Sequence, residues 1–192
     1  MNSVKYYTGR AKAKALDVLH MESSSYSKPV TKRRFIMVDV GSTAPNFNLH
    51  KSKTDTVELE KLRGKNVVVA FFPAAFTGVC EKELCSFRDA HSALNDLNAE
   101  VLGISVDGPF TNAAFADKNG LNFPLLSDYS RTTVNAYGIN HDDFAGLTGY
   151  TAAKRSVFVV DKEGVVRYAW IAPNPGVEPD YDAVKAAVSA LN

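Results

Sequence analysis

Two apolar runs dominate the hydrophobic pattern of this 192-residue chain. Val67–Phe72 and Val101–Val106 are short and almost without polar alternation, which is typical of strands that are covered on both faces. Between them, apolar residues recur at helical spacing, at Leu84, Phe87, Leu94 and Leu97. The pattern therefore predicts a buried strand, an amphipathic helix from about residue 80 to residue 98, and a second buried strand.

Weaker signals on both sides of this unit extend the fold. Polar residues 51–55 separate two short strand patterns and predict an N-terminal β-hairpin. Further along, the pattern predicts a helix over 111–119 with Thr111 as its N-cap, a strand over 124–126, a helix over 131–137, a hairpin of strands 156–160 and 165–171, and a last helix over 179–191. Alternating strands and helices of this kind indicate an α/β fold with a mixed central sheet flanked by helices.

Composition and charge narrow the class of protein. The chain is 45% hydrophobic and 22% charged, as in ordinary globular proteins. No apolar run approaches the roughly 20 residues that span a bilayer, so we expect no membrane association. Residues 37–192 carry fourteen basic and nineteen acidic residues, a net charge of −5. Since phosphate backbones are bound by an excess of Lys and Arg, we expect no nucleic-acid partner.

The first 36 residues differ from the rest of the chain. They hold eight Lys or Arg against two acidic residues, and a serine run at Ser23–Ser25. We interpret residues 1–36 as a basic, disordered N-terminal extension and residues 37–192 as the folded domain. The composition also fits an organelle transit segment. The location predicted for the protein is therefore cytoplasmic, or an organelle if residues 1–36 direct it there.

Cys80 is the main candidate for chemistry. It follows a strand that ends at Phe72 and stands near the start of the predicted helix, where backbone N–H groups and the helix dipole favour a thiolate. The hydroxyl of Thr77 can form a hydrogen bond beside the sulfur, and Pro73 can shield the site without adding an N–H donor. Only one other cysteine, Cys85, is present. A pair so close in sequence indicates redox or catalytic thiols in a reducing compartment.

The run from Pro73 to Cys80 resembles the Pro-x-x-x-Thr/Ser-x-x-Cys signature of peroxiredoxins, and the resemblance extends over about residues 38–192. It implies a thioredoxin-like fold and a peroxidase that needs no metal or haem cofactor. It also implies that Cys80 is the peroxidatic cysteine, which attacks the peroxide and becomes a sulfenic acid. Thr77 is then expected to position the peroxide, and Pro73 to shield the site.

The resemblance assigns two further residues to the site. Peroxiredoxins use an arginine at the start of a distant strand to stabilise thiolate and peroxide, and Arg155, which begins the segment 155–161, fits that pattern. Glu83 matches a glutamate that orients this arginine. The alternative for Glu83 is an exposed carboxylate near a favourable helix end.

Cys85 has two interpretations. Its spacing from Cys80 resembles that of the resolving cysteine in the bacterioferritin-comigratory, or peroxiredoxin Q, branch. Residues five apart rise about 7.5 Å along a helix, whereas the Cα atoms of a disulfide usually lie within about 7 Å. A bond between Cys80 and Cys85 therefore requires the first turn to unwind. In the alternative, Cys85 is a small buried helix residue, as in the AhpE-type branch, where a resolving cysteine need not be present.

The sequence thus predicts a thiol-dependent peroxidase acting on hydrogen peroxide and organic hydroperoxides. By resemblance, its partners are a thioredoxin or glutaredoxin-like reductant and a second copy of the chain, in a homodimer or higher homo-oligomer. A thiol-disulfide oxidoreductase or peroxide sensor on the same fold is the alternative, although the Cys-x-x-Cys spacing favoured by that chemistry is absent. The segment His141–Tyr150 suits a lid, a dimer contact or a plain surface loop.

Overall fold

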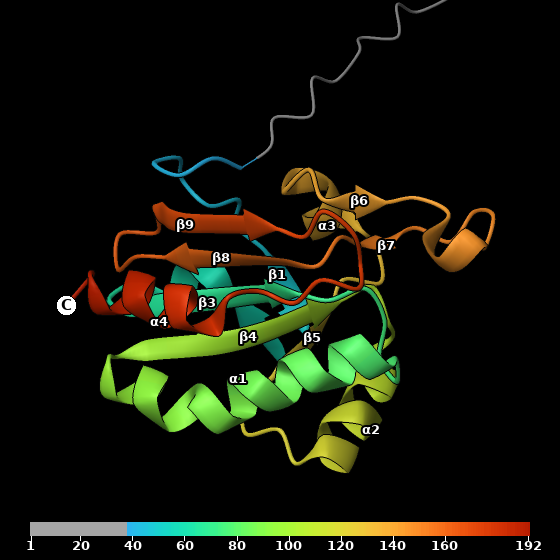
Figure 1. Cartoon of the computed structure of the whole chain (residues 1–192), viewed down its shortest axis with the longest axis horizontal. Coiled ribbons are helices and arrows are strands. Elements are labelled where there is room, and N and C mark those ends of the chain that lie inside the picture. The colour runs from blue at the N-terminus through green and yellow to red at the C-terminus, as the bar shows by residue number, and fades with distance from the viewer. Residues whose placement is uncertain (1–37) are drawn as a thin grey trace, which may run out of the picture. The chain divides into compact units, whose positions relative to one another are not determined.

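A seven-stranded mixed sheet forms the centre of residues 38–192, the part of the chain that the computed structural model describes (Figure 1). The expectations for residues 1–36 lie outside the described residues. The strand order is β2-β1-β5-β4-β3-β8-β9. The strands are β1 (Asn48–His50), β2 (Thr56–Glu58), β3 (Asn66–Phe71), β4 (Ala99–Ser105), β5 (Leu125–Ser127), β8 (Ser156–Val160) and β9 (Val166–Ile171).

The middle of the sheet is parallel and its two sides are antiparallel. Strands β3, β4 and β5 run parallel, because helices connect them. The hairpin of β8 and β9 adds antiparallel to β3, and the predicted N-terminal hairpin of β1 and β2 adds antiparallel to β5. The predicted mixed α/β sheet and its hairpins are therefore confirmed.

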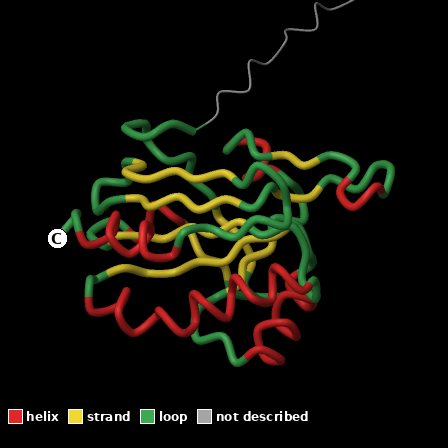
Figure 2. The backbone as a smooth tube through the Cα atoms, viewed as in Figure 1, coloured by secondary structure: helices red, strands yellow, loops and turns green. Residues whose placement is uncertain are grey.

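Helices and connecting segments cover both faces of the sheet (Figure 2). On one face, α1 (Gly78–Asp96), α2 (Pro109–Asn119) and α4 (Tyr181–Ser189) contribute to a single hydrophobic cluster. On the other face, α3 (Thr132–Ala136) packs with the segment around Phe47 in a second cluster. The 3-10 turn η1 (Leu59–Leu62) follows β2.

The strand β3 supplies both clusters, since alternate side chains of a strand point to opposite faces. Val67, Val69 and Phe71 enter the cluster with α3, and Val68 and Ala70 enter the cluster with α1. All six residues of β3 are buried. This double burial explains why the sequence shows a continuous apolar run rather than alternation.

Gly103 on β4 allows side chains from two elements to pack closely over the sheet. A Cβ placed there would come within 2.4 Å of Leu125 Cδ2 and 3.6 Å of Leu84 Cδ2. The first distance is too short for any real Cβ contact, so a larger residue would displace Leu125. The absence of a side chain at this position helps to keep α1, which carries Cys80, close to the sheet.

The prediction that Thr111 caps the second helix is wrong. That helix starts two residues earlier, with Gly108 as N-cap and Pro109 in the first turn. Proline is favoured there because its φ angle already suits the helix and its missing N–H would have no helical partner. The C-terminal end is as expected, since Gly120 adopts the left-handed conformation at φ 58°.

Two short strands were not predicted from the sequence. The strands β6 (Asn140–His141) and β7 (Ala152–Ala153) form a separate antiparallel pair, and the loop between them contains the 3-10 turn η2 (Phe144–Gly146). This loop projects beyond the end of the sheet where β3 leads into α1 (Figure 1). None of the helices formed by residues 38–192 is both long and apolar enough to cross a membrane.

Candidate active site

Cys80 lies in the first turn of α1, directly after the loop that follows β3. Thr77 is the N-cap residue of the helix, so Cys80 is its third residue. Its side chain is 1% exposed. The unpaired N–H groups of a first helical turn carry partial positive charge, and Cys80 stands in that turn.

Two hydrogen bonds fix the segment before Cys80, one to the loop after β4 and one within the segment itself. The backbone N–H of Ala75 donates to Asp107 Oδ2 at 2.8 Å, and Thr77 Oγ1 donates to the carbonyl of Ala74 at 2.9 Å. Because the Thr77 hydroxyl already donates its proton to that carbonyl, its oxygen remains available as a hydrogen-bond acceptor. Pro73 is buried in the same loop, where it offers no N–H.

Arg155 approaches Cys80 from the start of the β8 hairpin. Its Nη2 donates to Cys80 Sγ at 3.4 Å and to the carbonyl of Pro175 at 2.9 Å. Its Nε donates to the same carbonyl at 3.3 Å, and its Nη1 donates to Glu83 Oε2. The side chain is 1% exposed, so its charge acts in surroundings with little water to screen it.

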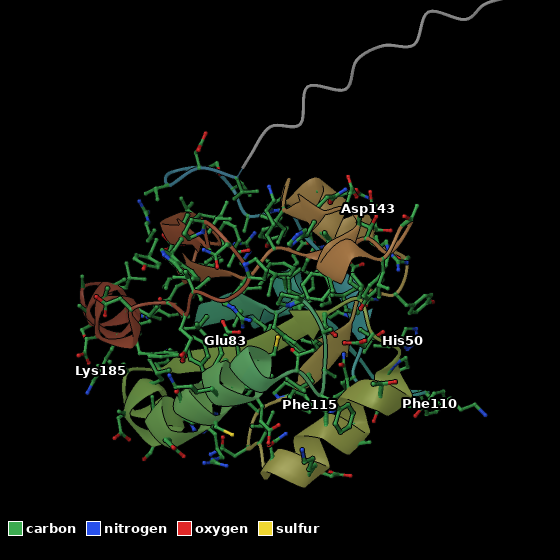
Figure 3. All side chains as sticks on the ribbon, turned by 45° about the vertical axis from the view of Figure 1, so that its right-hand side comes forward. His50, Glu83, Phe110, Phe115, Asp143 and Lys185 are labelled. Atoms are coloured by element: carbon green, nitrogen blue, oxygen red, sulfur yellow. The ribbon has the colours of Figure 1, made fainter. Side chains whose placement is uncertain are left out.

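Glu83 is a fully buried partner of Arg155 rather than an exposed helix carboxylate. Its side chain is 0% exposed and points from α1 into the interior of the domain (Figure 3). Its Oε1 has no hydrogen-bond partner among residues 38–192. Burial raises the pKa of Glu83 to about 8, although the charge of Arg155 opposes that shift. Burial and the guanidinium group of Arg155 therefore act on the Glu83 carboxyl group in opposite directions, burial favouring its neutral form and Arg155 its charged form.

The resulting cluster joins five of the six residues that the sequence analysis assigned to the site. A cavity of about 360 Å³ is lined by Pro73, Thr77, Cys80 and Arg155, and Glu83 lies behind it as the partner of Arg155. The chemistry that such a cluster supports is attack by a thiolate on a small polar molecule, with a cation and a hydrogen-bond acceptor within reach.

Cys85 lies outside this cluster. It is half-buried on the same helix, and its Sγ faces Asn119 Oδ1 of α2 at 3.9 Å. Both cysteines are free thiols, and α1 is continuous from Gly78 to Asp96. The intact helix therefore keeps the two sulfurs on different sides, as the five-residue spacing requires.

Sequence reasoning did not identify Pro175, whose carbonyl accepts two hydrogen bonds from Arg155. The Pro173–Gly176 segment could have indicated this contact. It follows β9, and β9 pairs with the strand that Arg155 precedes. It also did not place His141, which lines the cavity together with Phe144 and Ala145. Within residues 38–192, no three His, Cys, Asp or Glu side chains gather closely enough to hold a metal ion.

Comparison with protein families gives a match over most of the chain. Residues 40–169 match the AhpC/TSA family, a segment that contains the whole run from Pro73 to Cys80 and Arg155. Among curated proteins, alkyl hydroperoxide reductase E of Mycobacterium tuberculosis is 39% identical over 158 residues, which cover 81% of this chain and 99% of that protein. The chloroplastic peroxiredoxin Q of Triticum aestivum is 41% identical over 133 residues, but these span 69% of this chain and only 59% of that protein.

Solved structures show the same fold. The peroxidoxin BcpB of Mycobacterium tuberculosis matches with a TM-score of 0.71 and 30% identity, covering 81% of this chain and 99% of that one. A peroxiredoxin-like protein of Aquifex aeolicus matches with a TM-score of 0.73 and 26% identity over 82% of this chain and 90% of that one. The thioredoxin-like fold expected from the sequence is thereby confirmed.

Proposed function

The chain belongs to the AhpC/TSA family of peroxiredoxins, and from this premise we propose that it is a thiol-dependent peroxidase in which Cys80 reduces hydroperoxides. The observation that carries the proposal is the contact of Arg155 Nη2 with Cys80 Sγ at 3.4 Å inside a cavity that also holds Thr77 and Pro73. A buried thiol, a buried cation and a hydroxyl acceptor are the groups that peroxide reduction requires.

The reaction begins with the Cys80 thiolate. The sulfur attacks the terminal oxygen of the hydroperoxide, an S–O bond forms, and the O–O bond breaks. Sulfur is oxidised by two electrons to a sulfenic acid, and the leaving oxygen departs as an alkoxide or hydroxide that takes up a proton to give alcohol or water. Positive charge from Arg155 and the first turn of α1 stabilises the thiolate before attack.

Thr77 and Arg155 orient the peroxide. Since the Thr77 hydroxyl already donates to Ala74, its oxygen accepts the O–H of the bound hydroperoxide. Arg155 has five N–H donors in a fixed fork, so it can hold the sulfur and donate to the oxygen on which negative charge develops. Pro73 adds no N–H donor and excludes water from the sulfur.

We propose Cys85 as the resolving residue. The Cys85 thiol condenses with the Cys80 sulfenic acid, so that an S–S bond forms and one water leaves. This step requires the N-terminal part of α1 to unwind, because the structure holds the two thiols on an intact helix. A dithiol reductant of the thioredoxin or glutaredoxin type then returns both residues to thiols.

Two other parts of the proposal do not depend on the site: the assembly rests on the family, and the location rests on the cysteine content and on residues 1–36. We propose a homodimer or higher homo-oligomer as the working assembly. The location that we propose is the cytoplasm, with an organelle as the alternative if residues 1–36 direct the protein there. Size-exclusion chromatography with light scattering tests the first, and microscopy of the tagged full-length protein with and without residues 1–36 tests the second.

The test of the function is a coupled peroxidase assay with hydrogen peroxide. Thioredoxin, glutaredoxin and a monothiol such as glutathione are supplied separately with their recycling enzymes, and NADPH consumption is followed for the wild type, Cys80→Ser and Cys85→Ser. We expect turnover by the wild type with a dithiol protein and none by Cys80→Ser. Full activity of Cys80→Ser would contradict the proposal, and unchanged turnover of Cys85→Ser with thioredoxin would contradict the role of Cys85.

A further inference from the structure

The loop between β6 and β7 supplies part of the wall of the Cys80 cavity. Phe144 and Ala145 of this loop line the same cavity as Cys80 and Arg155. The loop lies more than 60 residues after Cys80 in the sequence and carries no group that reacts with a peroxide. Its contribution to the cavity is therefore a surface of carbon atoms.

The loop holds an unusual backbone conformation. Asp143 and Ala145 have φ angles of 49° and 57°, in the left-handed region that residues with a side chain seldom adopt. The conformation is fixed by hydrogen bonds from Gly149 N to Asp143 Oδ1 at 2.7 Å and from Phe144 N to the Tyr150 carbonyl at 2.9 Å. Backbone strain of this kind gathers at functional sites, where the surrounding contacts maintain it.

The ring of Phe144 is held in place by two aromatic neighbours. It packs edge-on against His141 with ring centroids 5.2 Å apart, and edge-on against Tyr150 at 5.8 Å. The side chain is only half-buried, so part of it remains available to a molecule in the cavity. Leu147 of the same loop, by contrast, is 59% exposed and does not line the cavity.

The cavity is larger than hydrogen peroxide requires. A water molecule occupies about 30 Å³ of liquid, and hydrogen peroxide is about two such units, whereas the cavity measures about 360 Å³. Beyond the polar groups near Cys80, the wall includes Val79, Phe144 and Pro175. A carbon substituent on the hydroperoxide would replace water against these side chains, which is favourable for apolar groups.

We propose that Phe144 is a specificity-determining residue that favours organic hydroperoxides over hydrogen peroxide by contacting their carbon substituent. The inference rests on the proposed peroxidase function and adds to it a determinant of substrate choice. Phe144 takes no part in proton or electron transfer. The contact increases the rate constant for hydroperoxides that carry an apolar group, whereas hydrogen peroxide has no group that can use it.

The test compares two peroxides on each variant. Stopped-flow experiments measure the second-order rate constants of the reduced protein with cumene hydroperoxide and with hydrogen peroxide, and the readout is their ratio. We expect Phe144→Ala to lower this ratio about tenfold, the size expected when a pocket loses apolar contacts. Phe144→Leu restores part of the ratio. Leu147→Ala, the matched control on the same loop, leaves it at the wild-type value.

The variant Ala145→Asn distinguishes a loss of apolar contact from a general loss of folding. Asn tolerates the left-handed region, so Ala145→Asn keeps the loop conformation while it places a polar group on the cavity wall, and we expect it also to lower the ratio. An unchanged ratio in Phe144→Ala and Ala145→Asn would overturn the inference, and so would an equal fall in Leu147→Ala. These results leave the peroxidase function intact, whereas failure of the wild type to react with either peroxide would refute the function itself.

Discussion

Replacement of Arg155 by Met removes the charge next to Cys80 while keeping much of the volume of the side chain. The change deletes the hydrogen bonds to Cys80 Sγ, to the Pro175 carbonyl and to Glu83. Since Arg155 is 1% exposed, water does not take over these contacts in the folded protein. The thiolate and the departing oxygen both lose the cation that stabilises them.

The distance between Arg155 and Cys80 sets the size of the expected loss of rate. At 3.4 Å and an effective dielectric constant near 20, two unit charges attract by about 5 kcal/mol. The net loss is smaller, because Arg155 is also desolvated and shared with Glu83. Loss of one donor to a developing oxyanion costs about 100- to 1,000-fold in other enzymes. We therefore expect the rate constant with hydrogen peroxide to fall about 100- to 1,000-fold in Arg155→Met.

Stopped-flow kinetics of the reduced protein with hydrogen peroxide measures this rate constant. Arg155→Lys serves as a partial control, because it keeps the charge but not the planar fork that reaches three partners, and we expect an intermediate rate. The double variant Arg155→Met/Glu83→Gln removes the carboxyl group left without its cation, so it restores stability without restoring rate. A rate for Arg155→Met within about threefold of the wild type, which corresponds to less than about 1 kcal/mol, would refute this reasoning.

Three further predictions follow from the same structure. Thr77→Val keeps the side-chain shape but removes the peroxide acceptor, so we expect the hydrogen peroxide rate to fall about 10- to 100-fold with far less effect on disulfide exchange; equal loss in both assays contradicts the role of Thr77. Burial raises the pKa of Glu83 from 4.5 to about 8, so the folded state binds this proton more tightly than the unfolded state, and the wild type should lose stability relative to Glu83→Gln as the pH rises between these values. Denaturant unfolding at several pH values checks this, and parallel pH profiles of the two proteins would count against it. Gly103→Ala forces a Cβ to within 2.4 Å of Leu125, so we expect a loss of about 1–3 kcal/mol in unfolding free energy, and a variant as stable as the wild type would show that the packing there is looser.

The sequence predicted the elements whose signals are local. The strand β3 is buried on both faces and therefore appears as a continuous apolar run, and α1 repeats apolar residues along its buried side. The start of α2 was misplaced because Thr111 is a good N-cap in isolation, whereas Pro109 two residues earlier is a better first-turn residue. The strands β6 and β7 are too short for a periodic signal.

Fewer features of the candidate site than of the fold could be predicted from local sequence patterns. Cys80 and Thr77 could be interpreted from one local run, but Arg155 was assigned only through the family resemblance, because its contact with Cys80 joins residues 75 positions apart. The buried position of Glu83 could not be distinguished from an exposed one without knowing that Arg155, which precedes β8, contacts the first turns of α1. The Pro175 carbonyl and the Phe144 ring reach the site through loop conformations that no local pattern indicates.

The most direct test of the central claim is intact-protein mass spectrometry after one equivalent of hydrogen peroxide, with dimedone to trap sulfenic acid. The wild type, Cys85→Ser and Cys80→Ser are compared. The account predicts that the wild type rapidly loses two hydrogen atoms as the disulfide forms, that Cys85→Ser gains a dimedone adduct on Cys80, and that Cys80→Ser does not react on this timescale. An adduct in both the wild type and Cys85→Ser would leave Cys80 as the reactive thiol but contradict Cys85 as its resolving partner. No rapid reaction in any of the three would contradict the peroxidase itself and favour thiol-disulfide exchange.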